Sequence, residues 1–274
     1  AIRTDATDFE QVRALARLAV EAYGRIDTWI NMVGVLNLAS FRDQTVEDFR
    51  RVIEVNLMGQ VHGAKAALPY LEATGGTLIC LGSGYSDRGA PLWSSYSASK
   101  HAIKGWVEAL RVELRHARSP VRVVLVKPSA INTPLYDNAK TLEGVKPTGV
   151  PPHYPPEFAA REILQATESK ARDVCIGDTA WLVSWLERLS PRLLDAVFLL
   201  IGCRGSRSDE PKAETDPNNL YGPVGGRARL RSSFIERELP FSPYQAVENH
   251  PVLAATAVAA LAGGLAGRGN GRSR

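Results

Sequence analysis

The chain has 274 residues and a formal net charge of +4 at pH 7, with 45% hydrophobic and 23% charged residues. This composition excludes a largely disordered chain and a collagen-like repeat, and the length allows one large domain or one domain with an appendage. The excess of positive charge lies mainly after residue 202. Composition therefore gives little support to nucleic-acid binding, which requires a basic face on the folded domain.

The three cysteines, Cys80, Cys175 and Cys203, lie far apart and form no Cys-x-x-Cys pair. This spacing argues against a disulfide framework and against a zinc site, and it is typical of proteins from a reducing compartment. The first residues do not show the charged and then apolar pattern of a signal segment. We therefore expect a cytoplasmic protein that holds no metal.

Helical and strand patterns alternate from the start of the chain. Residues 8–23 place apolar side chains at helical spacing, with Thr7 or Asp8 available as the N-cap and Gly24 after the last turn. The short apolar run over residues 26–34 predicts a buried strand. A helix is predicted next over residues 46–71.

The same alternation continues through the next hundred residues. Strands are predicted over residues 76–82, 121–128 and 173–177, and helices over residues 94–117, 157–169 and 179–200. Apolar strands that alternate with long helices are typical of a parallel sheet that is covered on both faces. The predicted fold class is therefore α/β, with a doubly wound parallel sheet.

The composition changes after Gly202. The residues up to 226 are polar and rich in turn formers, which indicates a linker or a surface-wrapping extension. Residues 252–266 are small and apolar, but a bilayer span needs about twenty such residues. We expect a docking helix or a frayed tail there, with a membrane-touching segment as the alternative. The predicted domains are residues 1–202 and an extension over residues 203–274.

Tyr96 and Lys100 form the first candidate catalytic pair, at the start of a long predicted helix. A spacing of four residues places the phenol and the ammonium on one helical face. An ammonium beside a phenol favours the phenolate, so it lowers a pKa that is normally about 10 toward the range of a general acid or base. The pattern is weak alone, because Tyr136 and Lys140 repeat it.

The surroundings favour the first pair. Ser83 stands thirteen residues before Tyr96, at the end of a predicted strand, where parallel-sheet proteins bind ligands. Its hydroxyl can hydrogen-bond a substrate oxygen, whereas Val123, which is thirteen residues before Tyr136, cannot. Asn56 adds a polar side chain to an otherwise apolar helical pattern. Each residue alone could be structural, as a turn cap or a helix kink, but their joint spacing predicts a catalytic set.

Six segments together resemble the short-chain dehydrogenase/reductase family. They are DATD (5–8), GRIDTWINMVG (24–34), VNLMG (55–59), LGS (81–83), YSASK (96–100) and VKPSAINTP (126–134). The resemblance implies a Rossmann-type domain that moves hydride between NAD(P)(H) and a carbonyl/alcohol pair. By this resemblance, Tyr96 is the proton donor or acceptor, and Lys100 lowers its pKa and holds the nicotinamide ribose. Ser83 orients and polarises the substrate oxygen, and Asn56 holds the water of a proton relay.

The resemblance also implies the cofactor contacts. Asp5 and the backbone of Ala6 would contact the adenine, and Asn31 and Gly34 would line the adenine-ribose side. The residues that would close over the nicotinamide are Pro128, Ile131 and Thr133. In the segment that matches the family's Asn-Asn-Ala-Gly, the two middle residues are the larger Met32 and Val33. Ser129 replaces the glycine that usually follows the proline at the position of Pro128. The expected cofactor is NADP or NAD, with NADP preferred.

One family motif lies outside the sequence as given. A Gly-xxx-Gly-x-Gly turn that binds the pyrophosphate would precede Asp5, so we expect an N-terminally truncated form whose first strand has an unpaired edge. Gly263, Gly267 and Gly269 match the motif literally. No helix follows them to present free N–H groups, so we attribute the match to the Ala/Gly-rich composition.

Three functions follow from these patterns. The first is an NAD(P)-dependent carbonyl reductase or alcohol dehydrogenase that acts on a small molecule as a homodimer or homotetramer, as the resemblance implies. The second is a non-catalytic binding or scaffold protein. The third is a peripheral membrane enzyme acting on lipid-like carbonyls, suggested by residues 252–266 and by the apolar run 193–202. Residues 135–156 occupy the family's substrate-lid position, and Leu92, Trp93 and Tyr136 would line an apolar pocket or belong to the core.

Overall fold

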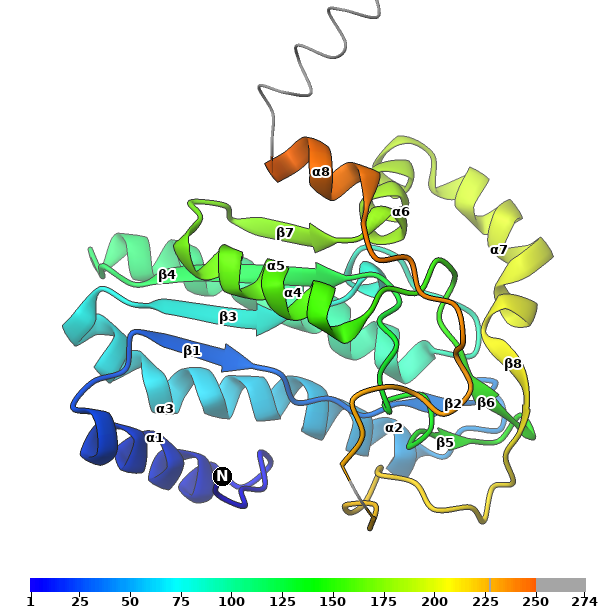
Figure 1. Cartoon of the computed structure of the whole chain (residues 1–274), viewed down its shortest axis with the longest axis horizontal. Coiled ribbons are helices and arrows are strands. Elements are labelled where there is room, and N and C mark those ends of the chain that lie inside the picture. Colours follow the sequence, from blue (N-terminus) through cyan, green and yellow to red (C-terminus); the bar gives the residue numbers. More distant parts are fainter. Residues whose placement is uncertain (227, 250–274) are drawn as a thin grey trace, which may run out of the picture.

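The computed structural model describes residues 1–226 and 228–249 and has a four-stranded parallel sheet between layers of helices (Figure 1). The segment predicted over residues 252–266 lies outside this part. The strands lie in the order β1 (Thr28–Asn31), β3 (Thr77–Leu81), β4 (Arg122–Pro128) and β7 (Asp173–Ile176). Helices cover both faces of this sheet, so the predicted α/β, doubly wound class is confirmed.

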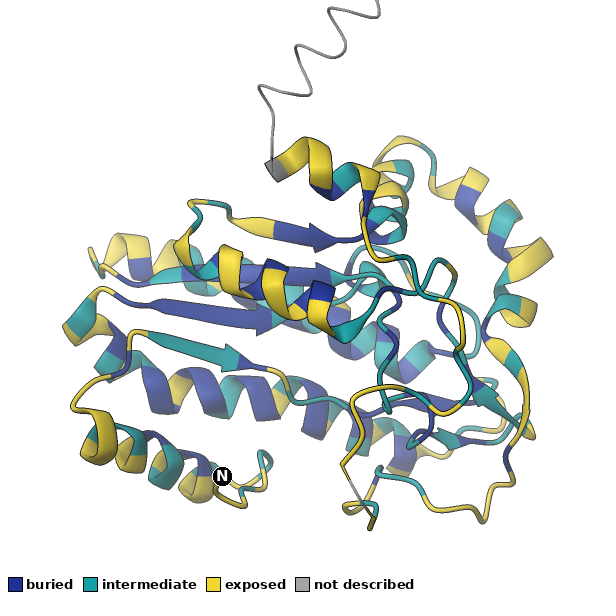
Figure 2. Cartoon of the chain, in the orientation of Figure 1, coloured by how far each residue is buried: buried dark blue, intermediate teal, exposed yellow. Residues whose placement is uncertain are grey.

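Successive side chains of β3 face opposite sides of the sheet, as the strand period of two requires. Leu78 is buried in a cluster with α3 (Gly59–Thr74) and α4 (Ser94–His116). The next residue, Ile79, is buried on the other face against α5 (Pro156–Glu168). Figure 2 shows the central strands buried along most of their length. A strand buried on both faces must be apolar throughout, which explains the unbroken apolar runs in the sequence.

The first helix, α1 (Phe9–Tyr23), packs against α3 rather than directly on the central strands (Figure 1). Of the two predicted N-cap residues, Asp8 has this role, because its carboxylate accepts hydrogen bonds from the backbone N–H groups of Glu10 and Gln11. Gly24 ends the helix in the left-handed region, with a φ of 81°. Glycine adopts this conformation without the steric cost that a Cβ brings.

The helix predicted over residues 46–71 is interrupted. α2 (Val46–Ile53) leads into a π-helical turn, η1 (Glu54–Met58), and only then does α3 begin. Asn56 lies in this turn with its side chain fully buried. Its amide pairs with both backbone groups of Val35. The prediction of one continuous helix is therefore wrong here. The helix changes to π-helical winding at the turn where Asn56 binds Val35, a residue distant in the sequence.

The helix predicted over residues 179–200 is two helices. α6 (Asp178–Leu189) ends before Ser190, and α7 (Pro191–Gly205) starts immediately after it. Pro191 has no backbone N–H and cannot continue α6, but it suits the first position of a new helix. The Ser190 hydroxyl accepts a hydrogen bond from the backbone N–H of Leu193 and so caps α7.

Short strands tie the remaining segments to this frame. β5 (Lys140–Thr141) pairs in parallel with β2 (Asn37–Leu38), and β6 (Val145–Pro147) pairs in antiparallel with β8 (Arg207–Pro211). The segment over residues 135–156, which was expected as a lid loop, thus contains two strands.

After β8 the chain returns across the molecule to α8 (Pro243–Asn249), as Figure 1 shows. α8 lies beside α6, since the ring of Tyr244 stacks on the ring of Trp181 with centroids 5.3 Å apart. Within the described residues, no helix combines the length and the apolar character that crossing a membrane would require.

Candidate active site

The four predicted catalytic residues meet where β3 ends and α4 begins. Lys100 donates a hydrogen bond from Nζ to the carbonyl oxygen of Leu81, the last residue of β3, at 2.9 Å. Asn56 donates to the hydroxyl of Ser99, at 3.0 Å, within the first turns of α4. The carboxyl ends of parallel strands form the ligand-binding edge of such sheets, so this is where a reactive site is expected.

Tyr96 and Lys100 share one face of α4, as predicted. The ammonium nitrogen of Lys100 lies 5.5 Å from the centre of the Tyr96 ring. The Lys100 side chain is buried, and within the described part of the chain the carbonyl of Leu81 is the one hydrogen-bond acceptor recorded for it. An ammonium has three N–H donors. This leaves donors of Lys100 for a ligand that has hydroxyl or carbonyl oxygens.

Burial dominates the pKa values of this pair. Burial raises the pKa of Tyr96 to about 12, and a hydrogen bond with Ser83 opposes that rise in part. Burial also lowers the pKa of Lys100 to about 8, because the charged ammonium loses its hydration. The predicted lowering of the phenol pKa by Lys100 is therefore wrong for the protein alone. At neutral pH the phenol holds its proton and can donate it.

Ser83 precedes a 3-10 turn, η2 (Gly84–Ser86), and is fixed by reciprocal hydrogen bonds. Its hydroxyl accepts from the backbone N–H of Tyr85 at 3.2 Å, while its own N–H donates to the hydroxyl of Ser86 at 3.1 Å. This is the capping box seen at helix starts. The Ser83 hydroxyl still has its own hydrogen to donate, so the capping role and the catalytic role predicted for this residue coexist.

Asn56 ties the loop after β1 to α4. Its Oδ1 accepts from the backbone N–H of Val35 at 2.7 Å, and its Nδ2 donates to the carbonyl of Val35 at 3.1 Å. The same Nδ2 donates to Ser99, whose hydroxyl donates to the carbonyl of Tyr96 at 2.7 Å. Both amide N–H groups are therefore engaged in positioning the site. The predicted water relay at Asn56 stays a prediction.

Gln60 is a site residue that the sequence analysis missed. Its side chain is fully buried, its Nε2 donates to the carbonyl of Leu81 at 2.8 Å, and its Oε1 accepts from the N–H of Leu81 at 3.1 Å. Gln60 thus fixes the same carbonyl that receives the Lys100 ammonium. A polar residue four positions after Asn56, in an apolar helical pattern, was the available signal.

Asp5 and Ala6 lie at the predicted adenine side of the sheet. The carboxylate of Asp5 accepts from the backbone N–H and the hydroxyl of Thr7, at 2.9 and 2.8 Å, and these bonds lower its pKa. A Cβ placed on Gly59 would lie 3.3 Å from the Cβ of Ala6 and 3.0 Å from a methyl group of Val33. The two predicted adenine-side segments therefore approach each other over the start of α3.

Asn31 points into the protein rather than toward this edge. Its Oδ1 accepts from the indole Nε1 of Trp29 at 2.8 Å, and its Nδ2 donates to the carbonyl of Gln60 at 3.1 Å. Gly63 provides the space, because a Cβ there would lie only 2.0 Å from Asn31 Oδ1. The Asn31 side chain has a structural role, and its predicted cofactor contact stays a prediction. Gly34 follows in the loop that Asn56 binds.

The predicted nicotinamide-side residues lie at the end of β4 and in the loop after it; they are Pro128, Ile131 and Thr133. The N–H of Gly82 donates to the carbonyl of Val126 at 2.8 Å and so holds the end of β3 beside the end of β4. Ser129, which replaces the family's glycine, accepts from the backbone N–H of Ala180 at 2.8 Å. The substitution therefore links this loop to α6.

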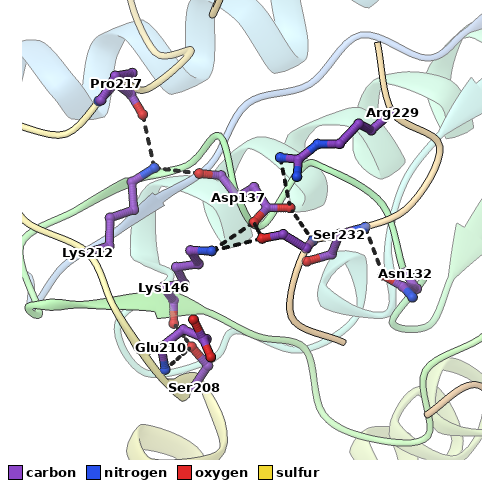
Figure 3. A network of polar contacts seen from close by, with 10 residues as sticks. Asn132, Asp137, Lys146, Ser208, Glu210, Lys212, Pro217, Arg229 and Ser232 are labelled. Carbon is purple, nitrogen blue, oxygen red and sulfur yellow. Dashed lines mark hydrogen bonds and ion pairs between the residues drawn. The ribbon is translucent and has the colours of Figure 1, made fainter. Parts of the chain in front are cut away.

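Residues 229–239, which we call the strap, cross the loop that carries these nicotinamide-side residues. The buried side chain of Asn132 donates to the carbonyl of Ile235 at 3.1 Å and accepts from the N–H of Ser232 at 3.0 Å. Asp137 provides a second anchor, because its carboxylate pairs with Arg229 of the strap. Lys146, which lies outside the strap, pairs with the same carboxylate, and both side chains point to it in Figure 3. The strap belongs to the segment expected as an extension, and it is fixed to the site.

The ring of Tyr96 packs in an aromatic, apolar cluster. The ring centroid of Trp93 lies 5.7 Å and that of Tyr85 lies 6.3 Å from the Tyr96 ring. Trp93 and Tyr136 are buried members of this cluster, and the partly buried apolar residues packed against it are Leu92, Leu135, Phe234 and Ile235. Leu92, Trp93 and Tyr136 were predicted to line an apolar pocket or to belong to the core. They belong to a core cluster, and the ring of Tyr96 packs against that same cluster.

The donors at this edge suit a nicotinamide nucleotide. A buried ammonium with donors to spare matches ribose hydroxyls, and a neutral phenol beside the hydroxyl of Ser83 matches a carbonyl oxygen. Over residues 1–226 and 228–249, no cluster of three or more His, Cys, Asp or Glu side chains is placed to hold a metal ion.

Comparisons with known proteins identify relatives of the chain. A family model described as short chain dehydrogenase matches residues 1–143. Uncharacterized oxidoreductase YxnA of Bacillus subtilis (strain 168) is 34% identical over 80% of this chain, which covers 63% of YxnA. Trans-4-hydroxycyclohexanecarboxylate dehydrogenase of Sinomonas cyclohexanicum is 32% identical over 54% of this chain and 56% of that protein. The chain thus spans less than two thirds of the length of either relative.

A solved structure shares this architecture and contains a nucleotide. It is a short chain dehydrogenase from Burkholderia cenocepacia J2315 in complex with NADP, and it is 28% identical to this chain. The match covers 73% of this chain and 80% of that one, with a TM-score of 0.62.

Proposed function

Because this chain belongs to the short-chain dehydrogenase family, we propose that it is an NAD(P)-dependent oxidoreductase that interconverts a carbonyl and an alcohol by hydride transfer. The observation that carries this proposal is the meeting of the Tyr96 phenol, the Ser83 hydroxyl and the Lys100 ammonium at the sheet edge. Burying an ammonium without a carboxylate partner costs free energy. A non-catalytic scaffold gains nothing from that cost, so the buried Lys100 favours an enzyme.

Each residue has a defined part in the proposed reaction. The cofactor, when bound, supplies or accepts the hydride. Tyr96 donates its phenolic proton to the substrate oxygen during reduction and accepts a proton during oxidation. Ser83 donates a hydrogen bond to the same oxygen and orients it. The charge of Lys100 stabilises the phenolate that remains on Tyr96 after the proton has left.

NADP is the proposed cofactor, in preference to NAD. Its support is the NADP in the solved relative from Burkholderia cenocepacia. Lys100 would hold the ribose on the nicotinamide side, next to the loop of Pro128, Ile131 and Thr133. The adenine half would lie against Asp5, Ala6, Asn31 and Gly34, of which Asn31 has only its backbone available.

We also propose that residues 1–202 form the catalytic domain and that residues 203–274 extend it. The strap supports a close connection between the two, because Asn132 and Asp137 of the first part hold Ser232 and Arg229 of the second. A cytoplasmic homodimer or homotetramer that pairs the long helices α3 and α4 is the expected assembly, and it is a prediction from the family resemblance.

Cofactor binding and turnover can be measured separately. NADPH and NADH are titrated against the protein while the intrinsic tryptophan fluorescence is followed. Their oxidation is then measured with aliphatic aldehydes, aromatic aldehydes and cyclic ketones. We expect NADPH to bind and to be consumed with at least one of these classes. Binding of the nucleotide without turnover of any carbonyl or alcohol would instead support a non-catalytic protein.

A further inference from the structure

The helices α6 and α7 expose an unusual number of large apolar side chains. We call this region the α6–α7 surface; its main exposed members are Trp181, Trp185, Leu189, Leu193, Leu199 and Leu200. Leu199 and Leu200 are 86% and 80% exposed, respectively, so nothing in the described chain covers them. Single exposed apolar residues are ordinary, but a group of this size on two consecutive, mutually packed helices marks a site of interaction.

The helix α7 is apolar on both of its sides. Leu194 and Phe198, one turn apart, are buried against the protein. Leu193 and Leu200 are two turns apart on the opposite side of the helix and face outward. A helix that is apolar all round is normally buried on all sides. With 15 residues, α7 is about 22 Å long, which is too short to cross the roughly 30 Å hydrocarbon core of a bilayer.

The charge around the α6–α7 surface is positive. Of the three acids on α6 and α7, Glu187 and Asp195 are bound to Arg88, at 3.1 and 2.5 Å, and Asp178 accepts hydrogen bonds from the hydroxyls of Tyr154 and Ser242. Three arginines, Arg188, Arg192 and Arg204, border the apolar side chains. None of the three forms an ion pair with a described residue. A bordering set of unpaired guanidinium groups is complementary to phosphate, which arginine binds strongly.

Two exposed tryptophans lie on the first helix of the α6–α7 surface. The rings of Trp181 and Trp185, one turn apart on α6, stack with centroids 6.5 Å apart and an interplanar angle of 15°. They are 41% and 49% exposed. Indole rings with one apolar side and one polar N–H are enriched where lipid headgroups meet hydrocarbon. Apolar residues, tryptophans and unpaired arginines thus occur together on one pair of helices.

We propose that the α6–α7 surface binds the surface of an anionic lipid bilayer, with α7 lying in the plane of the headgroups. Surface helices whose exposed leucines are bordered by arginines bind membranes in this way, through apolar burial and attraction to anionic lipids. The unpaired arginines favour an anionic lipid over a second copy of the chain, whose same surface carries the same positive charge. This inference concerns a surface outside the candidate active site and goes beyond the proposed function.

The proposed membrane surface adjoins the loop before the catalytic helix. A groove of about 700 Å³ lies between α7 and the start of α4, and Pro91, Ser97 and Phe198 are among the residues that line it. α7 packs closely there, because a Cβ on Gly202 would lie 2.9 Å from a ring carbon of Pro91. A protein bound by α7 would therefore hold the loop that leads to Tyr96 near the bilayer.

Vesicle sedimentation with the full chain tests this proposal. We expect the protein to bind vesicles of phosphatidylcholine and phosphatidylserine more strongly than vesicles of phosphatidylcholine alone, and binding should weaken as salt is added. The double variant Leu199→Gln/Leu200→Gln should bind about tenfold or more weakly, since two exposed leucines can no longer enter the lipid. Arg192→Gln/Arg204→Gln should lose most of the preference for phosphatidylserine, at about 1 kcal/mol per arginine, or roughly thirtyfold in all.

A matched control uses exposed apolar residues elsewhere. Val112 on α4 and Leu164 on α5 are 69% and 62% exposed, so Val112→Gln/Leu164→Gln changes the same kind of side chain away from α7. This control should bind vesicles like the unaltered protein. Brominated lipids should quench the tryptophan fluorescence, and Trp181→Phe/Trp185→Phe should remove most of that quenching.

Three outcomes would overturn the proposal. The first is equal binding of the Leu199→Gln/Leu200→Gln variant and the unaltered protein, which would place the lipid contact elsewhere in the chain. The second is the absence of binding to either kind of vesicle. The third is an oligomer in lipid-free buffer that this variant dissociates, without any vesicle binding, which would make the surface a contact between subunits. None of these readouts depends on turnover, so each is independent of the proposed enzymatic function.

Discussion

The chain contains the same tyrosine–lysine spacing twice, and the two copies have different structures. Tyr96 and Lys100 lie on one helix, with the ammonium 5.5 Å from the centre of the phenol ring. Tyr136 lies in a turn, and Lys140 begins the short strand β5. A separation of four residues brings side chains together on a helix, but it does not do so where the chain turns into a strand. The spacing predicts a pair only where a helix is present.

The two lysines also have different partners. Lys100 contacts a backbone carbonyl, whereas Lys140 forms an ion pair of 2.7 Å with the carboxylate of Asp48. Asp48 is buried and also accepts a hydrogen bond from the hydroxyl of Tyr221 at 2.8 Å. The ammonium of Lys140 is therefore bound within the structure, while that of Lys100 retains donors for a ligand. This comparison separates a structural lysine from a candidate catalytic one.

Tyr96→Phe should have the largest effect on the reaction. Loss of the phenolic proton should lower kcat by about 10²- to 10⁴-fold, which is the usual contribution of a general acid or base. Nucleotide affinity and thermal unfolding should change little, because the ring remains in its aromatic cluster. Steady-state kinetics with NADPH and fluorescence titration of the nucleotide measure the two quantities. A variant that retains full turnover would remove Tyr96 from the reaction.

Lys100→Met should lower kcat by about tenfold or more without lowering the free energy of unfolding. The pKa of Lys100 falls from 10.5 to about 8 on folding. Between these pH values the unfolded chain holds a proton that the folded chain has lost, so this group makes stability rise with pH there. The rise should be absent in Lys100→Met. Urea unfolding at several pH values between about 7 and 10 measures it.

The same titration should appear in the proposed activity of the unaltered protein. Above about pH 8 the ammonium of Lys100 loses its charge, so kcat/KM for carbonyl reduction should fall. A kcat/KM that stays constant from about pH 6 to 10 would contradict a role for the charged form of Lys100.

Lys140→Met should have the opposite pattern. Removing one partner of a buried ion pair leaves the Asp48 carboxylate uncompensated, so we expect the free energy of unfolding to fall by about 3–5 kcal/mol. The kcat of the folded fraction should remain within about twofold, because Lys140 does not contact Tyr96. Urea unfolding and kinetics on the same preparation measure both effects. A loss of kcat without a loss of stability would reverse the assignment of the two lysines.

Tyr136→Phe should have the smallest effect. In the described part of the chain the hydrogen bonds recorded do not include the Tyr136 hydroxyl, and the ring itself is buried in the apolar cluster. Phenylalanine retains that packing, so stability should change by less than about 1 kcal/mol and kcat by less than about twofold. The comparison with Tyr96→Phe is made in one assay. Equal losses in the two variants would leave the choice between the two copies without support.

Several local features could be predicted because their causes lie within a few residues. The helical spacing of residues 8–23 and the nearby cap residues predicted α1, and unbroken apolar runs predicted the buried strands. Pro191 also carried a local signal that the sequence analysis did not use, since a proline ends one helix and can start the next. The π-helical turn at Asn56 had no such signal, because it accompanies hydrogen bonds to Val35, which is 21 positions away.

The sequence by itself determined the α/β class and the candidate set of Asn56, Ser83, Tyr96 and Lys100, because periodicity, caps and motif spacing are local properties. Only the tertiary structure decided that burial raises the pKa of Tyr96 and that Gln60 supports the site. It also decided that the strap is fixed to the loop after β4, through Asn132 and Ser232, which are 100 positions apart. Burial and pairing depend on residues that are distant along the chain, and local patterns do not contain that information.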